Sequence, residues 1–348
     1  MHRIAIPTVF PLRLAPFEWF MLEDDQPGYP MTFVFWLRLS GHIRRSAFES
    51  ALEAALARHP LLHAVVELPA QSLPFWKPNS EIAPYLDWDA QGTPLGCTAG
   101  ERIDLTSEAG LRVWVRQGED SARVTLQFHH ACCDGLGALQ FIGDLLGAYG
   151  IRTAAGDGRP TLQPLDENRL LTRDDDFSES LPPSSDRSQK KGTALRRTFE
   201  SCSCHASPLN LPRTAAFPEN DHALFAGICT RTLDSEQSRC LLAAARRQGV
   251  TLNDLLLCWM FLTIVRWNEQ HGSRPPRPWL SVAMPASLRE PKDDRMPAAN
   301  RVTINFIIRA IDDCRDARSL LKSIHQETAG IRQTRDGSNF LKILKLLR

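Results

Sequence analysis

The chain has 348 residues, of which 43% are hydrophobic and 23% are charged, a composition that is ordinary for a soluble globular protein. Its formal net charge of +1 provides no overall field that attracts polyanions, so binding to nucleic acid is not expected. This length fits two domains or one large two-lobed unit.

The cysteines and the apolar segments indicate a cytoplasmic protein without a transmembrane segment. The nine cysteines are odd in number and scattered, which is typical of a reducing compartment rather than of a disulfide framework. Residues 1–20 contain prolines and charges where a signal peptide needs an unbroken apolar core. The longest apolar run, Leu255 to Val265, is too short to cross a bilayer and predicts a buried helix.

The N-terminal part of the chain predicts a strand followed by a helix. After an acidic turn at 23–25, apolar residues alternate across 31–39 and predict the strand. Ser46 and Glu49 are placed as the capping box of a helix that stops near Pro60.

The segment from 111 to 149 predicts two strands and a helix. The apolar patterns at 111–116 and 123–128 favour antiparallel strands joined by a polar loop at 117–121. After the second strand and a short polar turn, apolar residues recur at helical spacing. We expect this helix to bury Leu136, Leu139, Ile142, Leu146 and Tyr149.

The composition changes from residue 150 to about 220, where prolines and clusters of charge indicate a mobile connection with at most short helices. A strand is predicted at 223–233. The remaining predicted elements are a helix capped by Asp234 and ended by Gly249, an internal helix with a capping box of Thr251 and Asp254, strands at 279–284 and 302–308, and a helix at 317–334.

The polar turn after the second strand carries the pattern HHxxxDG, formed by His129, His130, Asp134 and Gly135. Four fixed residues at this spacing should arise by chance in roughly one chain of this size per thousand. The pattern resembles the signature of the CoA-dependent acyltransferase superfamily. That superfamily includes chloramphenicol acetyltransferase, condensation domains of nonribosomal peptide synthetases, plant-type alcohol acyltransferases and wax ester synthases.

The resemblance implies an α/β fold of two chloramphenicol-acetyltransferase-like lobes, each a mixed sheet flanked by helices, with a tunnel between the lobes. The lobes are expected at 1–165 and 216–348, with an interlobe linker at 166–215. In the superfamily the second lobe continues beyond the point that corresponds to Arg348, commonly with a DFGWG-like motif. This sequence lacks that motif, so the second lobe is expected to be incomplete.

The resemblance also implies that an acyl group moves from a thioester of CoA or of carrier-protein phosphopantetheine to a hydroxyl or amine of a small acceptor. No metal and no permanently bound cofactor is expected. His130 is the expected general base, because imidazole titrates near neutral pH. A non-catalytic module that binds a carrier protein or a partner enzyme is the alternative, and thioester hydrolysis is a third possibility.

The other motif residues have expected roles of their own. By the same resemblance His129 orients the loop, and Asp134 forms a structural ion pair with an arginine that the sequence does not identify. Gly135 allows a backbone conformation or a close approach that a Cβ would block. Ser287 and Asn300 fall in segments that resemble the superfamily's tunnel lining, and they are candidates for contact with the substrate or the oxyanion.

Two groups of cysteines invite other chemistry. Cys132 and Cys133 lie at the variable positions of the motif, which favours small buried thiols over a nucleophile. Cys202, Cys204 and His205 are residue types that bind zinc, but they have no second ligand cluster at metal-site spacing and lie in the predicted linker, so a zinc site is not expected.

Overall fold

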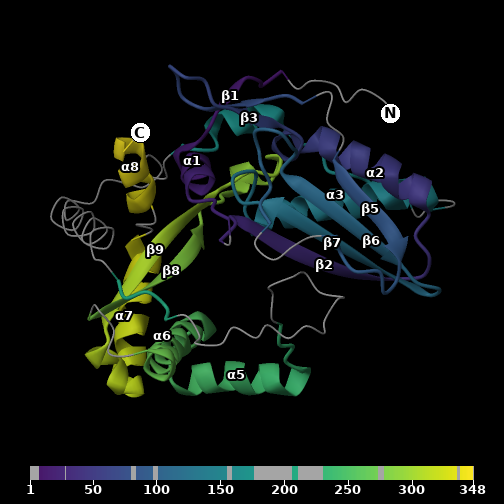
Figure 1. Cartoon of the computed structure of the whole chain (residues 1–348). Helices are drawn as coiled ribbons and strands as arrows, with labels where there is room; N and C mark the ends of the chain where they lie inside the picture. Colours follow the sequence, from purple (N-terminus) through teal and green to yellow (C-terminus); the bar gives the residue numbers. More distant parts are fainter. Residues whose placement is uncertain are drawn as a thin grey trace.

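The computed structural model describes most of the chain. The described residues are 8–27, 29–79, 84–96, 101–154, 159–175, 206–210, 230–272, 278–334 and 338–347. They form two lobes, one built on the N-terminal strands and one on the strands β8 (Trp279–Ser287) and β9 (Val302–Ala310) (Figure 1).

A four-stranded sheet in the order β2-β7-β6-β5 forms the centre of the first lobe. Its strands are β2 (Thr32–Ser40), β5 (Tyr85–Ala90), β6 (Leu111–Gln117) and β7 (Ser121–His129). Neighbours are antiparallel except β5 and β6. The predicted antiparallel pair that leads into the histidines is therefore confirmed. A smaller sheet consists of β1 (Leu12–Arg13), β3 (Val65–Glu67) and β4 (Phe75–Lys77).

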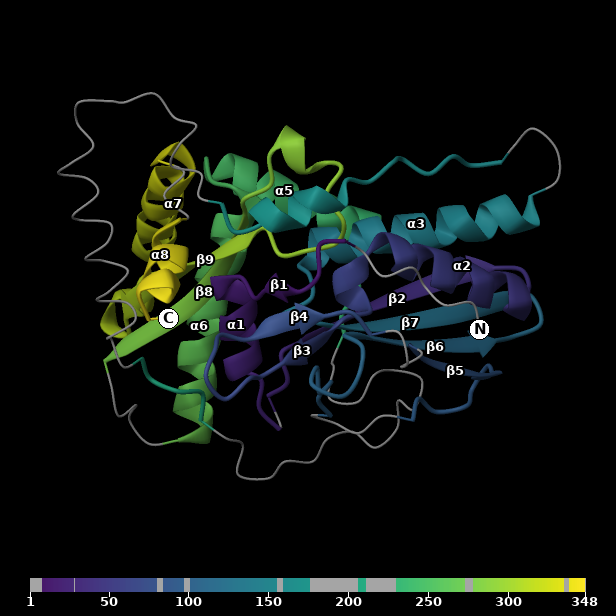
Figure 2. The same cartoon turned by 90° about the horizontal axis from the view of Figure 1, so that it is seen from above.

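Helices α2 (Arg45–Arg58) and α3 (Gly135–Thr153) lie together along one face of the four-stranded sheet (Figure 2). The predicted capping box of α2 is wrong. The helix begins before Ser46, its N-cap residue Arg44 has no side-chain cap, and Glu49 instead pairs with Arg45 (2.8 Å). The stop before Pro60 is as predicted, and a 3-10 helix follows at Pro60–Leu62.

The predicted buried face of α3 is right for Ile142 but wrong for its three leucines. Leu136 and Leu139 are each 50% exposed, and the side chains that face the core are Ala138, Phe141, Ile142, Leu145 and Ala148. In this row Phe141 packs edge-on against Phe128 of β7 (5.9 Å). Burial thus follows the fit to the neighbouring layer, not the largest apolar side chains.

The described part of the second lobe contains a two-stranded antiparallel sheet and three long helices. They are α5 (Ser235–Arg247), α6 (Leu252–His271), β8 (Trp279–Ser287), β9 (Val302–Ala310) and α7 (Ala317–Thr334), with 3-10 helices at Pro291–Asp293 and Asp312–Arg315. The caps predicted at Asp234 and at Thr251 with Asp254 are confirmed.

The expectation that α6 is internal is wrong for one of its faces. Leu256, Trp259 and Met260 are between 42% and 51% exposed, whereas Leu257 and Phe261 are buried against the two strands. The described sheet covers only one side of the helix, so an apolar stripe remains on the other side.

The linker begins with an ordered, packed segment rather than a mobile tether. Residues 167–172 form a 3-10 helix (Glu167–Thr172), Leu170 is buried, and Arg173 is 4% exposed. The Cys202, Cys204 and His205 group lies outside the described residues, as does most of the strand predicted at 223–233. Residues 230–233 form no strand.

Two helices pack against each other where the two lobes meet. These are α1 (Pro16–Glu23) and α8 (Ser338–Leu347), which lie beside each other in Figure 1. Phe340 of α8 packs edge-on against Phe20 of α1 (5.3 Å) and Phe306 of β9 (5.5 Å). The core of the first lobe therefore continues onto the second.

Within the described ranges no single helix is long and apolar enough to span a membrane, although α5 and α6, bent by 96°, pass the same test as a pair. The described residues also contain no group of three or more His, Cys, Asp or Glu side chains that could hold a metal ion.

Candidate active site

The loop between β7 and α3 carries the HHxxxDG pattern and is fixed at both ends. The N–H of His129 donates to Gly110 O (2.9 Å), and the N–H of His130 donates to Met31 O (2.7 Å). At the other end Asp134 is the N-cap of α3 and accepts from the Gly137 N–H (2.8 Å). The local sequence produces this arrangement, since a strand ends at the histidines and Asp is a strong N-cap residue.

His129 is fully buried, and one of its ring nitrogens is hydrogen-bonded to the loop. Its Nδ1 accepts from the Ala131 N–H (3.0 Å), and its Nε2 lies 3.6 Å from Asp25 Oδ2. Burial raises the pKa of Asp25, but His129, the Met31 N–H and Arg102 outweigh it, so this pKa is lowered overall. His129 therefore bonds to the loop through Nδ1, while its buried Nε2 faces an ionised carboxylate from the acidic turn at a distance longer than a hydrogen bond.

His130 is only partly buried, and its ring packs against Phe33 of β2 (4.5 Å between centroids). Burial, followed by the charge of His129, lowers the pKa of His130 to about 4, against the opposing effects of Asp134 and a hydrogen bond with the Cys133 backbone. The ring is consequently neutral at pH 7. A neutral imidazole can accept a proton.

The arginine that pairs with Asp134 is Arg289, which comes from the second lobe. Its Nη2 lies 2.9 Å from Asp134 Oδ1, and the backbone N–H of Arg301 donates to Oδ2 (2.8 Å). One carboxylate thus caps α3 and binds the second lobe at two points.

Residues 298–301, which we call the strap, connect the second lobe to this loop. The Ala298 N–H donates to His59 Nδ1 (2.8 Å), and Ala299 O accepts from Arg289 (2.9 Å). The Nδ2 of Asn300 donates to His130 O (2.7 Å) and Ala131 O (2.9 Å). Each residue of the strap therefore bonds to a group that builds or supports the histidine loop.

These contacts change the interpretation of Asn300. Its two amide hydrogens are occupied by loop carbonyls and its side chain is almost fully buried, so its geometry favours support of the loop rather than donation to a substrate or an oxyanion. Ser287, in contrast, is exposed at the end of β8, where its Oγ accepts from the Arg289 N–H (3.2 Å). Its hydroxyl hydrogen remains able to donate.

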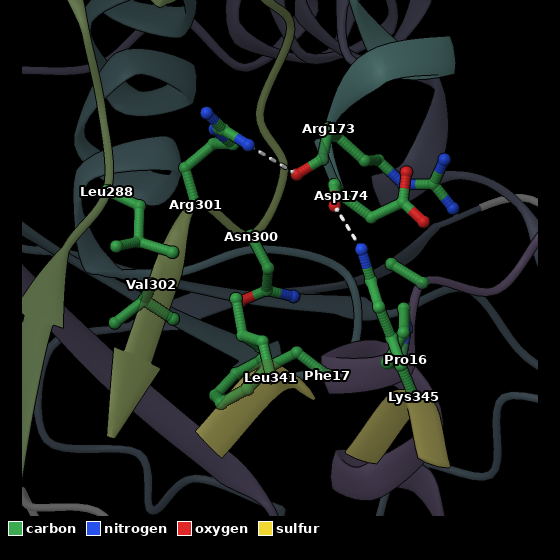
Figure 3. Close-up of a pocket in the computed structure, with 11 residues that line it drawn as sticks. Pro16, Phe17, Arg173, Asp174, Leu288, Asn300, Arg301, Val302, Leu341 and Lys345 are labelled. Atoms are coloured by element: carbon green, nitrogen blue, oxygen red, sulfur yellow. Dashed lines mark hydrogen bonds between the residues drawn. The ribbon is translucent and has the colours of Figure 1, made fainter. Parts of the chain in front are cut away.

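The Oδ1 of Asn300 is buried without a hydrogen-bond partner among the described residues, and Asn300 lines a small cavity of about 20 Å³, room for one water molecule. Figure 3 shows Asn300 between Arg301 and the apolar side chains of Phe17 and Leu341. His130 does not line this cavity.

The close approach that we expect at Gly135 occurs at Gly137 instead. A Cβ on Gly135 would meet no atom within 4 Å, and its φ is not positive. A Cβ on Gly137 would lie 3.1 Å from both Ala299 N and Ala299 O. The first turn of α3 therefore touches the strap backbone at Gly137, and no neighbouring group requires glycine at 135.

Gly137→Ala is expected to destabilise the fold by about 1–3 kcal/mol, because the added methyl group must push the strap away from α3. Gly143→Ala on the same helix is the matched control, since its Cβ meets nothing within 4 Å, and it should stabilise by about 0.5–1 kcal/mol. Urea unfolding of both variants measures the difference. Equal effects would contradict the close contact.

Cys132 and Cys133 are fully buried, and burial raises the pKa of each thiol well above its ordinary value. The prediction of buried thiols in place of a nucleophile is confirmed. Sequence reasoning missed His59, Asp25, Arg289 and Arg301. For Asp25 the signal was the acidic turn, but nothing local links the other residues to the loop.

Comparison with known proteins places this geometry in a familiar fold. No protein-family model matches the chain. An uncharacterized Mycobacterium tuberculosis protein, MT2362, is 25% identical over 331 residues, which cover 93% of this chain and 72% of that protein. The probable non-canonical nonribosomal peptide synthetase CymA of Salinispora arenicola is 29% identical over 254 residues, which cover 71% of this chain and 3% of CymA.

Solved structures of similar shape come from nonribosomal peptide synthesis. The X-domain from teicoplanin biosynthesis, solved with OxyB, has a TM-score of 0.62 and 19% identity, covering all of this chain and 76% of that one. The first condensation domain of the calcium-dependent antibiotic synthetase has a TM-score of 0.65 and 14% identity, covering 93% of this chain and 75% of that one. The starter condensation domain of rhizomide synthetase RzmA was solved as a mutant in complex with C8-CoA and Leu-SNAC. It has a TM-score of 0.61 and 16% identity, covering 97% of this chain and 74% of that one. The chain therefore has the condensation-domain fold, an α/β architecture of the CoA-dependent acyltransferase type.

Proposed function

We propose that this protein is an acyltransferase that moves an acyl group from a thioester to a hydroxyl or amine, with His130 as general base. The observation that carries this proposal is the neutral, partly exposed His130 ring at the end of a buried strand. Its Nδ1 is buried, which leaves Nε2 as the nitrogen that can reach a substrate.

In the proposed reaction the acceptor O–H or N–H lies within about 3 Å of His130 Nε2. Nε2 takes the proton while the acceptor atom attacks the thioester carbonyl, and a tetrahedral oxyanion forms. The oxyanion collapses, the carbon–sulfur bond breaks, and the departing thiolate takes the proton back from His130. Ser287, with its free hydroxyl hydrogen, is a candidate donor to the bound acyl or acceptor group.

The condensation-domain fold and the relation to a peptide synthetase support acyl transfer in the general sense. The donor is proposed to be an acyl-CoA or an acyl-phosphopantetheine on a carrier protein, because the RzmA domain of the same fold was solved with C8-CoA and Leu-SNAC. The acceptor is a small molecule, and the residues of the loop supply the chemistry without a permanently bound cofactor.

Thiol release from a panel of acyl-CoAs and carrier-bound acyl thioesters, with and without pooled alcohols and amines, tests this proposal. Release that depends on the acceptor and yields the ester or amide is the expected result. Release at the same rate without any acceptor would indicate a hydrolase. A folded protein that releases no thiol from any donor would overturn the proposal in favour of a binding module.

The pH dependence of the acyl-transfer rate should reflect the lowered pKa of His130. Only the neutral ring can accept a proton, so kcat/KM should fall as the pH drops through about 4 rather than through 6.5, the ordinary value. Initial rates between pH 3.5 and 8 measure this limb, with circular dichroism as a control for folding. A midpoint near 6.5 would contradict the buried environment of the ring.

A further inference from the structure

His59 lies outside the histidine loop. Its ring makes two hydrogen bonds, as the donor in one and the acceptor in the other. It follows α2, is 0% exposed, and packs edge-on against Phe141 (5.5 Å). Its Nε2 lies 3.0 Å from Asp144 Oδ2 on α3, and its Nδ1 lies 2.8 Å from the backbone nitrogen of Ala298.

These partners determine where the ring proton sits. A backbone N–H can only donate, so Nδ1 must be unprotonated and Nε2–H must donate to Asp144. A doubly protonated ring would direct an N–H at the Ala298 N–H. Burial lowers the pKa of His59, opposed by Asp144 and assisted by Arg58, which keeps the ring in the accepting form.

Ala298 is the first residue of the strap, so the bond to His59 anchors the segment that supports the catalytic loop. Two residues later Asn300 donates to the carbonyls of His130 and Ala131. A shift of Ala298 away from His59 would move Asn300, and with it the backbone that carries the His130 ring. Misplacement of a catalytic group by about 1 Å can cost on the order of 10²-fold in rate.

We propose that His59 is a positioning residue for acyl transfer, which accepts from the Ala298 N–H to hold the strap, and hence His130, in place. The inference rests on the proposed function. It also predicts loss of the anchor in acid, since protonation converts the acceptor Nδ1 into a donor.

The charged groups around His59 are Asp144 on α3 and Arg58 on α2, which donates to the same Asp144 oxygen (2.6 Å). The loop before the strap carries Arg295, whose Nε donates to Pro164 O (3.2 Å). Asp144 favours the protonated ring, whereas Arg58 and burial oppose it.

Two polar substitutions separate the two bonds of His59. His59→Asn places an amide oxygen near the position of Nδ1 and keeps an acceptor for Ala298. His59→Gln places its amide group near the position of Nε2, so it keeps the bond to Asp144 but loses the acceptor. We expect the His59→Asn variant to retain the wild-type kcat within a few-fold. We expect the His59→Gln variant to have a kcat lower by about 10²-fold, and KM should change little in either variant.

Hydrogen exchange of the 296–301 segment gives a second readout that needs no turnover. In the Gln variant the Ala298 amide should exchange on the order of tenfold faster than in the wild type and in the Asn variant. Because the pKa of His59 is lowered by burial, exchange relative to the intrinsic rate should rise in the wild type only when the pH falls well below the ordinary value of histidine, and it should stay level in the Asn variant. Unchanged exchange of the Ala298 amide in the His59→Gln variant would overturn the proposed anchor. Parallel pH profiles of exchange in the wild type and the His59→Asn variant would overturn it as well.

The outcomes also separate this inference from the proposed function. Faster exchange with unchanged kcat in the Gln variant would overturn the positioning role while leaving acyl transfer intact. A folded wild type without acyl transfer would overturn the proposed function and the positioning role together, even if the exchange data establish the bond to Ala298. If the Gln variant does not fold, the pH profiles of wild type and Asn variant decide alone.

Discussion

His130→Ala is expected to lower kcat/KM for acyl transfer by about 10²–10⁴-fold, the range that a positioned general base contributes. Without the ring, the acceptor must lose its proton to water while it attacks the thioester. The ring packs against Phe33 and, within the described part of the chain, is hydrogen-bonded to no other side chain, so the variant should remain folded. Thiol release with the best donor and acceptor pair measures the loss.

The matched control for this substitution is His42→Ala. His42 is exposed, and its ring contacts only the neighbouring Ile43 carbonyl among the described hydrogen bonds. This variant should transfer at the wild-type rate. If His130→Ala also retained the wild-type rate while folded, the assignment of His130 as the base would be wrong.

Glu18→Ala should destabilise the protein by about 3–5 kcal/mol, the largest effect on stability that we expect. Glu18 is fully buried and lies 2.6 Å and 2.8 Å from two nitrogens of Arg173. It also accepts from the Trp76 indole (2.9 Å) and the Ala15 N–H (2.7 Å). Its removal leaves the buried guanidinium of Arg173 without its charge partner.

Urea unfolding of Glu18→Ala beside Glu49→Ala tests this expectation. Glu49 forms an ion pair with Arg45 at a similar distance, 2.8 Å, but both side chains are largely exposed, so its loss should cost less than about 1 kcal/mol. Equal costs would show that burial of the Glu18 and Arg173 pair does not determine its contribution. The pair matters for the site because Arg173 O accepts from Arg301, the last residue of the strap (2.9 Å).

Elements whose signals lie within a few residues could be predicted from the sequence. The antiparallel pair β6 and β7, the caps of α5 and α6, and the turn that leads from His130 into α3 are all local patterns. The HHxxxDG spacing was enough to indicate the condensation-domain fold. The burial of the Cys132 and Cys133 thiols could also be predicted, because they lie at the variable positions of that pattern.

The phase of α3 and the charged and polar partners were decided by tertiary structure alone. Periodicity defines a helix, but which of its faces is buried depends on the layer that it meets. In α3 the buried face is the row of Ala138, Phe141 and Leu145. Arg289 reaches Asp134 across 155 residues of sequence, and Ala298 reaches His59 across 239. Hydrogen bonds at such separations leave no local pattern, because each partner is chosen by the packing of one lobe on the other. The sequence by itself therefore determined the loop that carries His129 and His130 and indicated its fold, whereas the support that holds the loop was set by the contact between the lobes.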